Sequence, residues 1–225
     1  MKILHIYSGT YTGGGIIKKM INLITNDSSN NHELYFIWYS DPQGKRYDMM
    51  AYLNDLQVEY RYTYHKNIWL NIPDLYRHLK RNNYDVIHFY TDNVMVLGKI
   101  VQLMGIKQKY VRSFEGAPMY TKFPQKQLVN WALTSCRNFA SISKYVKSSY
   151  TQIYPSLKGT NQVVIYNTLV HKMQRHTCIT DREGIICVGT LTDQKQFDVA
   201  IKAISIIKVK YDKEIPLYIL GNGND

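Results

Sequence analysis

A glycine-rich loop over residues 9–15 is the first stretch whose composition could do chemistry. It includes Gly13 and Gly14 and lies between an expected strand and an expected helix. Consecutive glycines let backbone N–H groups approach an anion, and the N-terminus of the following helix attracts negative charge. The loop therefore indicates a phosphate contact, with a merely tight turn or a nicotinamide-type site as the alternatives.

Three further positions place a titratable side chain at the end of an expected strand or in the loop that follows it. His88 ends a strand over residues 85–89, and its imidazole could exchange a proton or bind a sugar hydroxyl, or be a structural residue. Glu115 follows the next strand and could orient an acceptor hydroxyl, or be an ordinary loop glutamate. Lys195 closes a loop before a helix, where its compact cation could clamp a diphosphate or simply face solvent.

Short apolar strands that alternate with helical stretches must position these residues. This rhythm predicts a parallel sheet with helices on both faces, a Rossmann-like α/β fold. Ligands of such sheets bind at the carboxyl ends of the strands, so the loop, His88 and Glu115 should share one rim. Expected strands cover residues 3–7, 33–39, 58–62, 85–89, 109–113, 139–143 and 163–166, and expected helices cover 16–25, 47–56, 73–83, 94–104, 125–135 and 144–153.

The pattern breaks over residues 168–183, which are polar, basic and without periodicity. We expect an interdomain linker there, after an N-terminal domain over residues 1–167. The remaining residues, 184–225, predict a strand over 185–188, a helix over 197–210 and a strand over 217–220. A parallel sheet needs both faces covered, so one strand–helix–strand unit predicts only the incomplete start of a second Rossmann-like domain.

Composition narrows the class of protein. Of the 225 residues 45% are hydrophobic and 20% charged, as in globular proteins, and no apolar run is long enough for a transmembrane helix. The N-terminus resembles a buried strand rather than a signal peptide. Three cysteines without metal-ligand spacing favour a reducing cytoplasm and give no reason to expect a metal.

The formal net charge of +11 suits an anionic membrane surface, phosphorylated substrates, nucleic acid, or solubility alone. The basic residues form no dense run, and no RNA-binding signature surrounds the 20 tyrosines, so no nucleic-acid partner is expected. Residues 118–137 mix aromatic and basic side chains, which fits either an anionic interface or a plain packing helix.

Taken in order, these segments resemble the retaining glycosyltransferases of family 4, which have the GT-B fold, over essentially the whole chain. The most specific match is the block from Val188 to Gln196 with the segments after it. The matching segments are the glycine loop, Asp85–His88, Ser113–Gly116, Ala140–Ser143, Val164–Asn167, Val188–Gln196, Ala200–Ala203 and Leu217–Gly223.

The resemblance implies transfer of a sugar, a hexose in our interpretation, from a nucleotide sugar to an acceptor hydroxyl with no metal or other cofactor. It implies that Gly13 and Gly14 lie near the donor diphosphate, that Lys195 contacts it, and that His88 lies beside the transferred sugar. The expected acceptor is a saccharide or a polyprenyl-linked saccharide of polysaccharide, lipopolysaccharide or glycolipid assembly. The expected location is the cytoplasm, peripheral to the inner face of the cell membrane.

Two positions depart from the family pattern. Thr190 stands where an arginine usually follows Val-Gly, and Glu115-Gly116 stands where His-Gly is common. The family's pair of glutamates would lie beyond Asp225, so we expect an incomplete donor site and a chain that is inactive alone. A non-catalytic module that binds the acceptor or a partner chain is the second hypothesis, and a nicotinamide-dependent oxidoreductase is the third.

Overall fold

The computed structural model describes residues 1–9, 15–38, 45–167, 183–221 and 223. The chain divides into two compact units, Met1–Val170 and His171–Asp225, and each is described by itself. The expected boundaries at residues 167 and 184 remain a prediction, because almost all of the expected linker lies outside the described residues.

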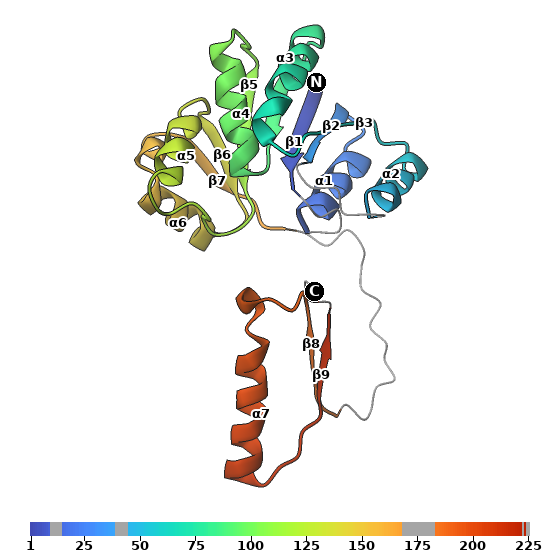
Figure 1. Ribbon diagram of the computed structural model, residues 1–225, viewed down its shortest axis with the longest axis vertical. Helices are drawn as coiled ribbons and strands as arrows, with labels where there is room; N and C mark the ends of the chain where they lie inside the picture. Colours follow the sequence, from blue (N-terminus) through green and yellow to red (C-terminus); the bar gives the residue numbers. More distant parts are fainter. Residues whose placement is uncertain (10–14, 39–44, 168–182, 222, 224–225) are drawn as a thin grey trace. The chain divides into compact units, whose positions relative to one another are not determined.

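The first unit is built on a seven-stranded sheet in the order β3-β2-β1-β4-β5-β6-β7 (Figure 1). All its paired strands are parallel. The chain therefore steps outward from β1 in one direction and, after β3, returns to the other side of β1 to continue outward. The strands are β1 (Lys2–Ser8), β2 (Asn31–Trp38), β3 (Tyr60–Tyr64), β4 (Val86–Phe89), β5 (Lys109–Phe114), β6 (Asn138–Ser141) and β7 (Asn161–Val164).

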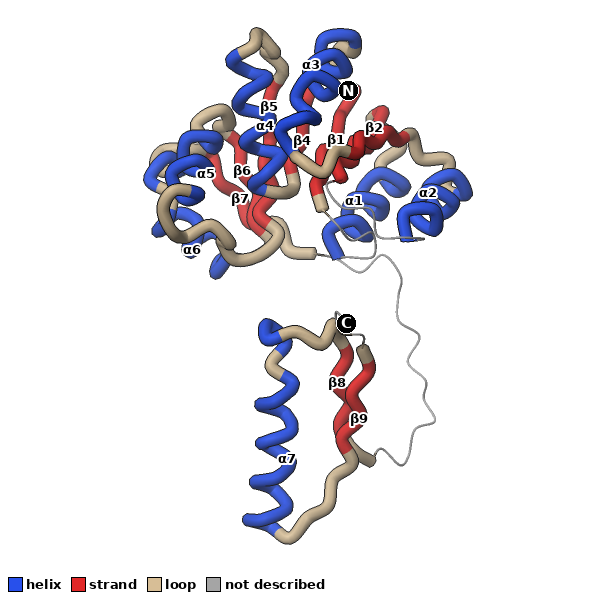
Figure 2. The backbone as a smooth tube through the Cα atoms, viewed as in Figure 1, coloured by secondary structure: helices blue, strands red, loops and turns tan. Residues whose placement is uncertain are grey.

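Helices on both faces cover this sheet (Figure 2), as expected for strands buried on two sides. The helices are α1 (Gly15–Asn26), α2 (Lys45–Asp55), α3 (Ile72–Arg81), α4 (Asp92–Leu103), α5 (Gln125–Leu133) and α6 (Lys144–Ile153), with short 3-10 turns η1 (Ile68–Asn71) and η2 (Pro155–Leu157). The predicted Rossmann-like α/β fold is confirmed.

Two apolar cores occupy the two faces of the sheet. Leu4 and Ile6 of β1 belong to a core with residues of α3, α4 and α5, whereas Leu34 and Phe36 of β2 pack with α1 and α2. Because side chains alternate along a strand, His5 of β1 points to the face covered by α1 and α2. This alternation decides which polar residues of the central strands can meet.

Strand β3 begins two residues later than the sequence predicts. The backbone N–H of Val58 donates to the carbonyl of Leu53, and that of Gln57 donates to Asn54. Gln57 adopts the left-handed conformation, with φ of 54°. This pattern is the Schellman motif that closes a helix C-terminus, so Val58 belongs to the cap after α2 and packs in the core instead of starting the strand.

The segment over residues 118–137 contains a packing helix. Val129, Ala132 and Leu133 of α5 are buried in the core of the first unit. Met119 and Phe123, which precede the helix, are 82% and 78% exposed. The helix therefore packs on the core through one face, while Leu128 and Trp131 of the same helix are 39% and 38% exposed.

The second unit contains β8 (Ile185–Val188), a turn η3 (Asp193–Lys195), helix α7 (Phe197–Tyr211) and β9 (Leu217–Leu220), with β8 and β9 parallel. The strands approach so closely at their ends that a Cβ on Gly221 would lie 1.7 Å from the carbonyl oxygen of Gly189. No residue of α7 is buried. Across both units, no described helix has the length and apolar character needed to span a bilayer.

Candidate functional site

A cavity of about 350 Å³ opens at the carboxyl ends of β1, β4 and β5. The sheet order reverses between β1 and β4, and ligands of open α/β sheets bind in the crevice at such a switch point. The cavity therefore lies where this fold places a ligand. Its lining residues are Tyr7, Ser8, Gly9, Ile16, Tyr90, Thr91, Asp92, Asn93, Arg112, Glu115, Gly116, Ala117, Met119, Tyr120 and Tyr150.

A buried ion pair forms one part of the cavity wall. Nη2 of Arg112, on β5, lies 2.8 Å from Oδ1 of Asp92, which begins α4, and the side chains are 3% and 5% exposed. The hydroxyl of Tyr150 lies 3.4 Å from Oδ2 of the same carboxylate. A buried charge without a partner would be costly, so the two side chains stay in contact and each holds the other in place. The pair thereby fixes the end of β5 against the start of α4.

A second ion pair joins helix α1 to the loop after β5. Nζ of Lys19 lies 2.9 Å and 3.1 Å from the two carboxylate oxygens of Glu115, whose side chain is only 4% exposed. The predicted acceptor-side residue therefore lies at the cavity, with its charge matched by a lysine. The sequence did not single out Lys19, because Lys18 directly precedes it and Glu115 lies 96 residues away along the chain.

His88 is not among the residues that line the cavity. Its Nε2 lies 2.7 Å from Oγ of Ser113, and its Nδ1 lies 3.1 Å from the hydroxyl of Tyr90, which does line the cavity. Burial, followed by the nearby His5, lowers the pKa of His88 well below 6.5, so the ring is neutral at pH 7. Its contact with the cavity runs through the Tyr90 hydroxyl.

The Tyr90 hydroxyl is held between two imidazoles, because Nδ1 of His5 lies 3.0 Å from it. Nε2 of His5 lies 2.9 Å from Nδ1 of His32, whose Nε2 lies 3.1 Å from a carboxylate oxygen of Asp27. Burial, followed by His32, lowers the pKa of His5 to about 3, and burial raises the pKa of Tyr90 well above 10. A chain of hydrogen bonds from Asp27 through His32 and neutral His5 therefore runs across neighbouring strands and orients the Tyr90 hydroxyl at the cavity.

The remaining polar groups of the cavity are mostly hydroxyls and amides. Oγ of Ser8 lies 2.8 Å from Oγ1 of Thr91, and the hydroxyl of Tyr120 donates to the side chain of Asn93 at 3.0 Å. Groups that both donate and accept hydrogen bonds suit a ligand rich in hydroxyls. Arg112, the lining cation among the described residues, is already paired with Asp92, so this part of the structure favours a polyhydroxyl ligand over a free polyanion.

The described structure does not place the other predicted site residues relative to this cavity. Gly13 and Gly14 lie outside the described residues. Lys195 belongs to the second unit, where its aliphatic carbons pack over Gly189 at the end of β8. Their diphosphate contacts remain predictions. Within the described ranges, no group of three or more His, Cys, Asp or Glu side chains could hold a metal ion.

Comparison with known proteins gives a family and a fold. A sequence model of the family described as Glycosyl transferase 4-like matches residues 29–143, which is more than half of the chain. A search of curated proteins found no sequence match.

Solved structures with the same architecture include sugar-nucleotide proteins. The apo lipopolysaccharide outer core galactosyltransferase WaaB is 19% identical with a TM-score of 0.64, and the match covers 100% of this chain and 62% of WaaB. Alr3699/HepE from Anabaena, in complex with UDP, is 13% identical with a TM-score of 0.70 at the same coverage. UDP-GlcNAc 2-epimerase from Neisseria meningitidis, bound to UDP-GlcNAc, is 13% identical with a TM-score of 0.62 and coverages of 97% and 65%.

These likenesses support the GT-B fold and no specific reaction, because one of the three proteins is an epimerase. The chain spans less than two thirds of the length of these structures. The fold, the cavity at the switch point and the family match agree, and the chain belongs to the glycosyl transferase 4-like family.

Proposed function

We propose that this chain is the acceptor-side part of a glycosyltransferase that moves a sugar from a nucleotide sugar to an acceptor hydroxyl. In this reaction the bond between the anomeric carbon and the diphosphate oxygen breaks. A bond from the acceptor oxygen to that carbon forms, and the hydroxyl proton is released. The observation that carries the proposal is a hydroxyl-lined cavity at the switch point of a family member's sheet.

The roles of the cavity residues follow from their pairing. Glu115, held by Lys19, would accept a hydrogen bond from the acceptor hydroxyl, and the Tyr90 hydroxyl, oriented by His88 and His5, would contact the sugars. Arg112 is paired with Asp92 and Lys19 with Glu115, so neither of these cations is free to neutralise a diphosphate. We therefore propose that Gly13 and Gly14, through backbone N–H groups, and Lys195 serve the diphosphate, with no metal ion.

The second unit supports a proposal about completeness. None of the residues of α7 is buried, and Val188 and Val209 are 71% and 85% exposed. Apolar surface of this kind is stabilised when further polypeptide covers it. We propose that tight donor binding needs additional chain over α7, β8 and β9, and that these residues alone are inactive.

The proposed acceptor is a saccharide or a polyprenyl-linked saccharide of cell-surface polysaccharide or lipopolysaccharide assembly. The net charge of +11 would favour the anionic inner face of the cell membrane, where such lipids are used. A cytoplasmic, membrane-peripheral location follows from this proposal and is tested by fractionation of cells that express the protein.

A donor-binding experiment tests the proposed function. Labelled UDP-sugars would be titrated into this chain and into a longer version, and transfer to a saccharide acceptor would be followed by mass spectrometry. We expect weak binding by this chain, with tighter binding and transfer by the longer version. Equal, tight binding by both would refute the need for additional chain, and no binding by either would refute the glycosyltransferase proposal.

Substitutions at the cavity separate the enzyme from a non-catalytic binding module. Glu115→Gln and Lys19→Met should each lower transfer by the longer version, whereas Lys18→Met, an exposed neighbour on the same helix, should not. If the protein is a binding module, saccharide binding will respond to the substitutions but no transfer will be detected from any donor.

A further inference from the structure

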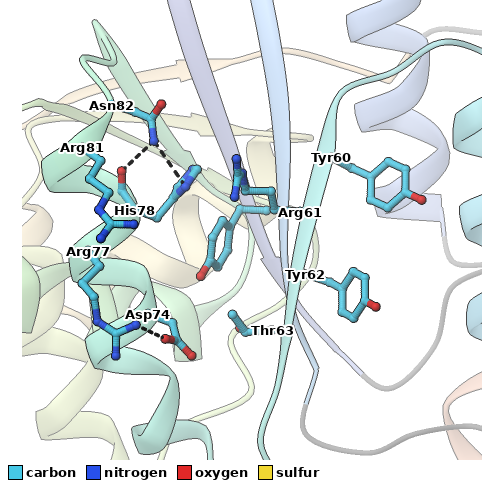
Figure 3. Close-up of a pocket in the computed structure, with 10 residues that line it drawn as sticks. Tyr60, Arg61, Tyr62, Thr63, Asp74, Arg77, His78, Arg81 and Asn82 are labelled. Atoms are coloured by element: carbon cyan, nitrogen blue, oxygen red, sulfur yellow. Dashed lines mark hydrogen bonds and ion pairs between the residues drawn. The ribbon is translucent and has the colours of Figure 1, made fainter.

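A larger cavity, of about 640 Å³, lies between the edge strand β3 and helix α3. It shares no lining residue with the cavity at the switch point. The volume falls in the range of small-molecule sites, which is about 300–1,000 Å³. Its lining residues, shown in Figure 3, are Tyr35, Tyr60, Arg61, Tyr62, Thr63, Asp74, Arg77, His78, Arg81 and Asn82.

Strand alternation and helix periodicity bring three guanidinium groups to this cavity. Arg61 pairs in register with Tyr35 on β2, and Figure 3 shows its side chain on the α3 side of β3, with Tyr60 and Tyr62 pointing the other way. On α3, Arg77 and Arg81 are four residues apart and therefore lie on one face of the helix. The strand and the helix thus present arginines to the same space.

The charges of the cavity do not cancel. Asp74 is the only carboxylate among the lining residues, and it pairs with Arg77 at 2.9 Å and with His65 at 3.3 Å. Arg81 has no ion-pair partner in the part of the chain that the structure describes. The three arginines therefore leave an excess of positive charge in a space that protein side chains do not fill.

A buried carboxylate, Glu33, contacts two of the residues that line the cavity. Glu33, with a side chain 8% exposed, accepts a hydrogen bond from the Tyr84 hydroxyl at 2.6 Å, and its other oxygen lies 3.2 Å from Nε2 of His78. Nε of Arg61 lies 3.4 Å from that oxygen, yet the Arg61 side chain is 66% exposed. Glu33 thereby anchors the inner edge of this guanidinium and leaves its outer part accessible.

We propose that the cavity between β3 and α3 is an anion site for a phosphate-bearing ligand. Guanidinium groups form paired, charge-assisted hydrogen bonds to phosphate oxygens, and Arg81 and the outer part of Arg61 are available for them. The buried ring of Tyr35 lies against this space, and burial raises the pKa of its hydroxyl to about 12. Tyr35 is therefore a neutral donor at pH 7 and adds no repulsion. The site is independent of the proposed transfer reaction.

A phosphate titration of the whole chain tests the site. Inorganic phosphate and a hexose phosphate would be added at constant ionic strength, and the arginine Nε–Hε signals followed by NMR. We expect saturable shifts at Arg61, Arg77 and Arg81. Arg81→Gln should weaken binding about tenfold, as expected for loss of a charge-assisted hydrogen bond. Asp74→Asn should strengthen binding severalfold, because it removes the carboxylate that competes for Arg77.

A second arm distinguishes a lipid headgroup from a soluble phosphate. Co-sedimentation with phosphatidylglycerol vesicles, compared with phosphatidylcholine vesicles, reports the lipid source, and loss of that binding in Arg81→Gln would assign it to this site. Binding of the hexose phosphate without vesicle binding assigns a soluble ligand.

The matched control is Arg137→Gln, which removes one exposed arginine of the first unit outside the cavity. Thermal melts followed by tryptophan fluorescence confirm that each variant is folded. Equal losses of phosphate affinity in Arg137→Gln and Arg81→Gln would mean that binding depends on net charge alone, and would overturn the proposed site. Absence of saturable binding to both phosphates and to both vesicle types would also overturn it.

Discussion

Replacement of Arg112 by glutamine is the sharpest test of how the first unit holds its cavity. The substitution keeps a polar side chain but shortens it and removes the positive charge. Asp92 would then remain buried, with a side chain 5% exposed, and would keep only the Tyr150 hydroxyl at 3.4 Å. The hydrogen bond from Arg112 to the carbonyl of Phe89, at 3.4 Å, would be lost as well.

The size of the effect follows from burial of both partners. Breaking a buried ion pair by removing one partner costs about 3–5 kcal/mol, since the other charge stays uncompensated. With a urea m-value of about 1–3 kcal/mol/M, the midpoint should fall by roughly 2 M. The double variant Asp92→Asn with Arg112→Gln removes both charges, and it should recover at least half of the lost stability.

Tryptophan fluorescence suits this measurement, because Trp38, Trp69 and Trp131 are the three tryptophans of the chain and all belong to the first unit. Their signal therefore reports unfolding of the unit that contains the ion pair. A double-mutant cycle isolates the pair, since the contact with the Phe89 carbonyl is lost equally in both backgrounds. A cost below about 1 kcal/mol for Arg112→Gln, or an equal cost with and without Asp92→Asn, would refute the buried pair.

Three other substitutions have expected outcomes. Gly98→Ala should destabilise by about 1 kcal/mol net, because the new Cβ would lie 2.5 Å from Cζ of buried Phe89, and overpacking of about 1–3 kcal/mol outweighs a helix gain of about 1; urea unfolding checks it. Burial lowers the pKa of His5 to about 3 in the folded protein, against 6.5 for an unperturbed histidine. Its contribution to the free energy of unfolding is therefore complete above pH 6.5 and is lost as the pH falls toward 3. In that window His5→Gln should remove about 1.4 kcal/mol per pH unit from the slope of unfolding free energy against pH. Ser143→Ala should cost about 1 kcal/mol in a thermal melt, because Oγ of Ser143 accepts from the Val146 N–H at 3.1 Å at the start of α6.

Each of these three expectations has its own internal check. In a Phe89→Leu background Gly98→Ala should become harmless, and a persistent cost would contradict the clash with the ring. An unchanged pH slope in His5→Gln would mean that this imidazole titrates normally in the folded protein. Ser143→Gly should cost only a few tenths of a kcal/mol, because glycine is itself tolerated at a helix N-cap.

Apolar periodicity was sufficient to place most of the elements. Helix α6 and strands β8 and β9 begin and end where the pattern predicts, and β4 and β5 differ from it by one residue at one end. These segments are governed by local rules, since a helix repeats every 3.6 residues and a strand every two. Strand β3 departs because Val58, apolar like a strand residue, is used to close α2 through a contact with Leu53.

The candidate site was only partly accessible to such reasoning. Glu115 could be placed at the rim, because it follows a strand of a parallel sheet, and the structure places it there. Its partner Lys19, 96 residues away, could not be distinguished from Lys18 by spacing. For His88, the sequence placed the strand end at the correct rim but not the side chain. The imidazole hydrogen-bonds Ser113 and Tyr90 and does not line the cavity.

The sequence by itself determined the family, the parallel sheet and the rim at which its ligand-binding loops gather, because these depend on local patterns and on their order along the chain. Only the tertiary structure decided which charges meet. The pairs Arg112–Asp92 and Lys19–Glu115, and the arginines gathered between β3 and α3, come from segments brought together by strand order and side-chain direction. Pairing of this kind depends on distances of a few ångströms across the fold. Local patterns of residues along the chain do not show which distant side chains come that close.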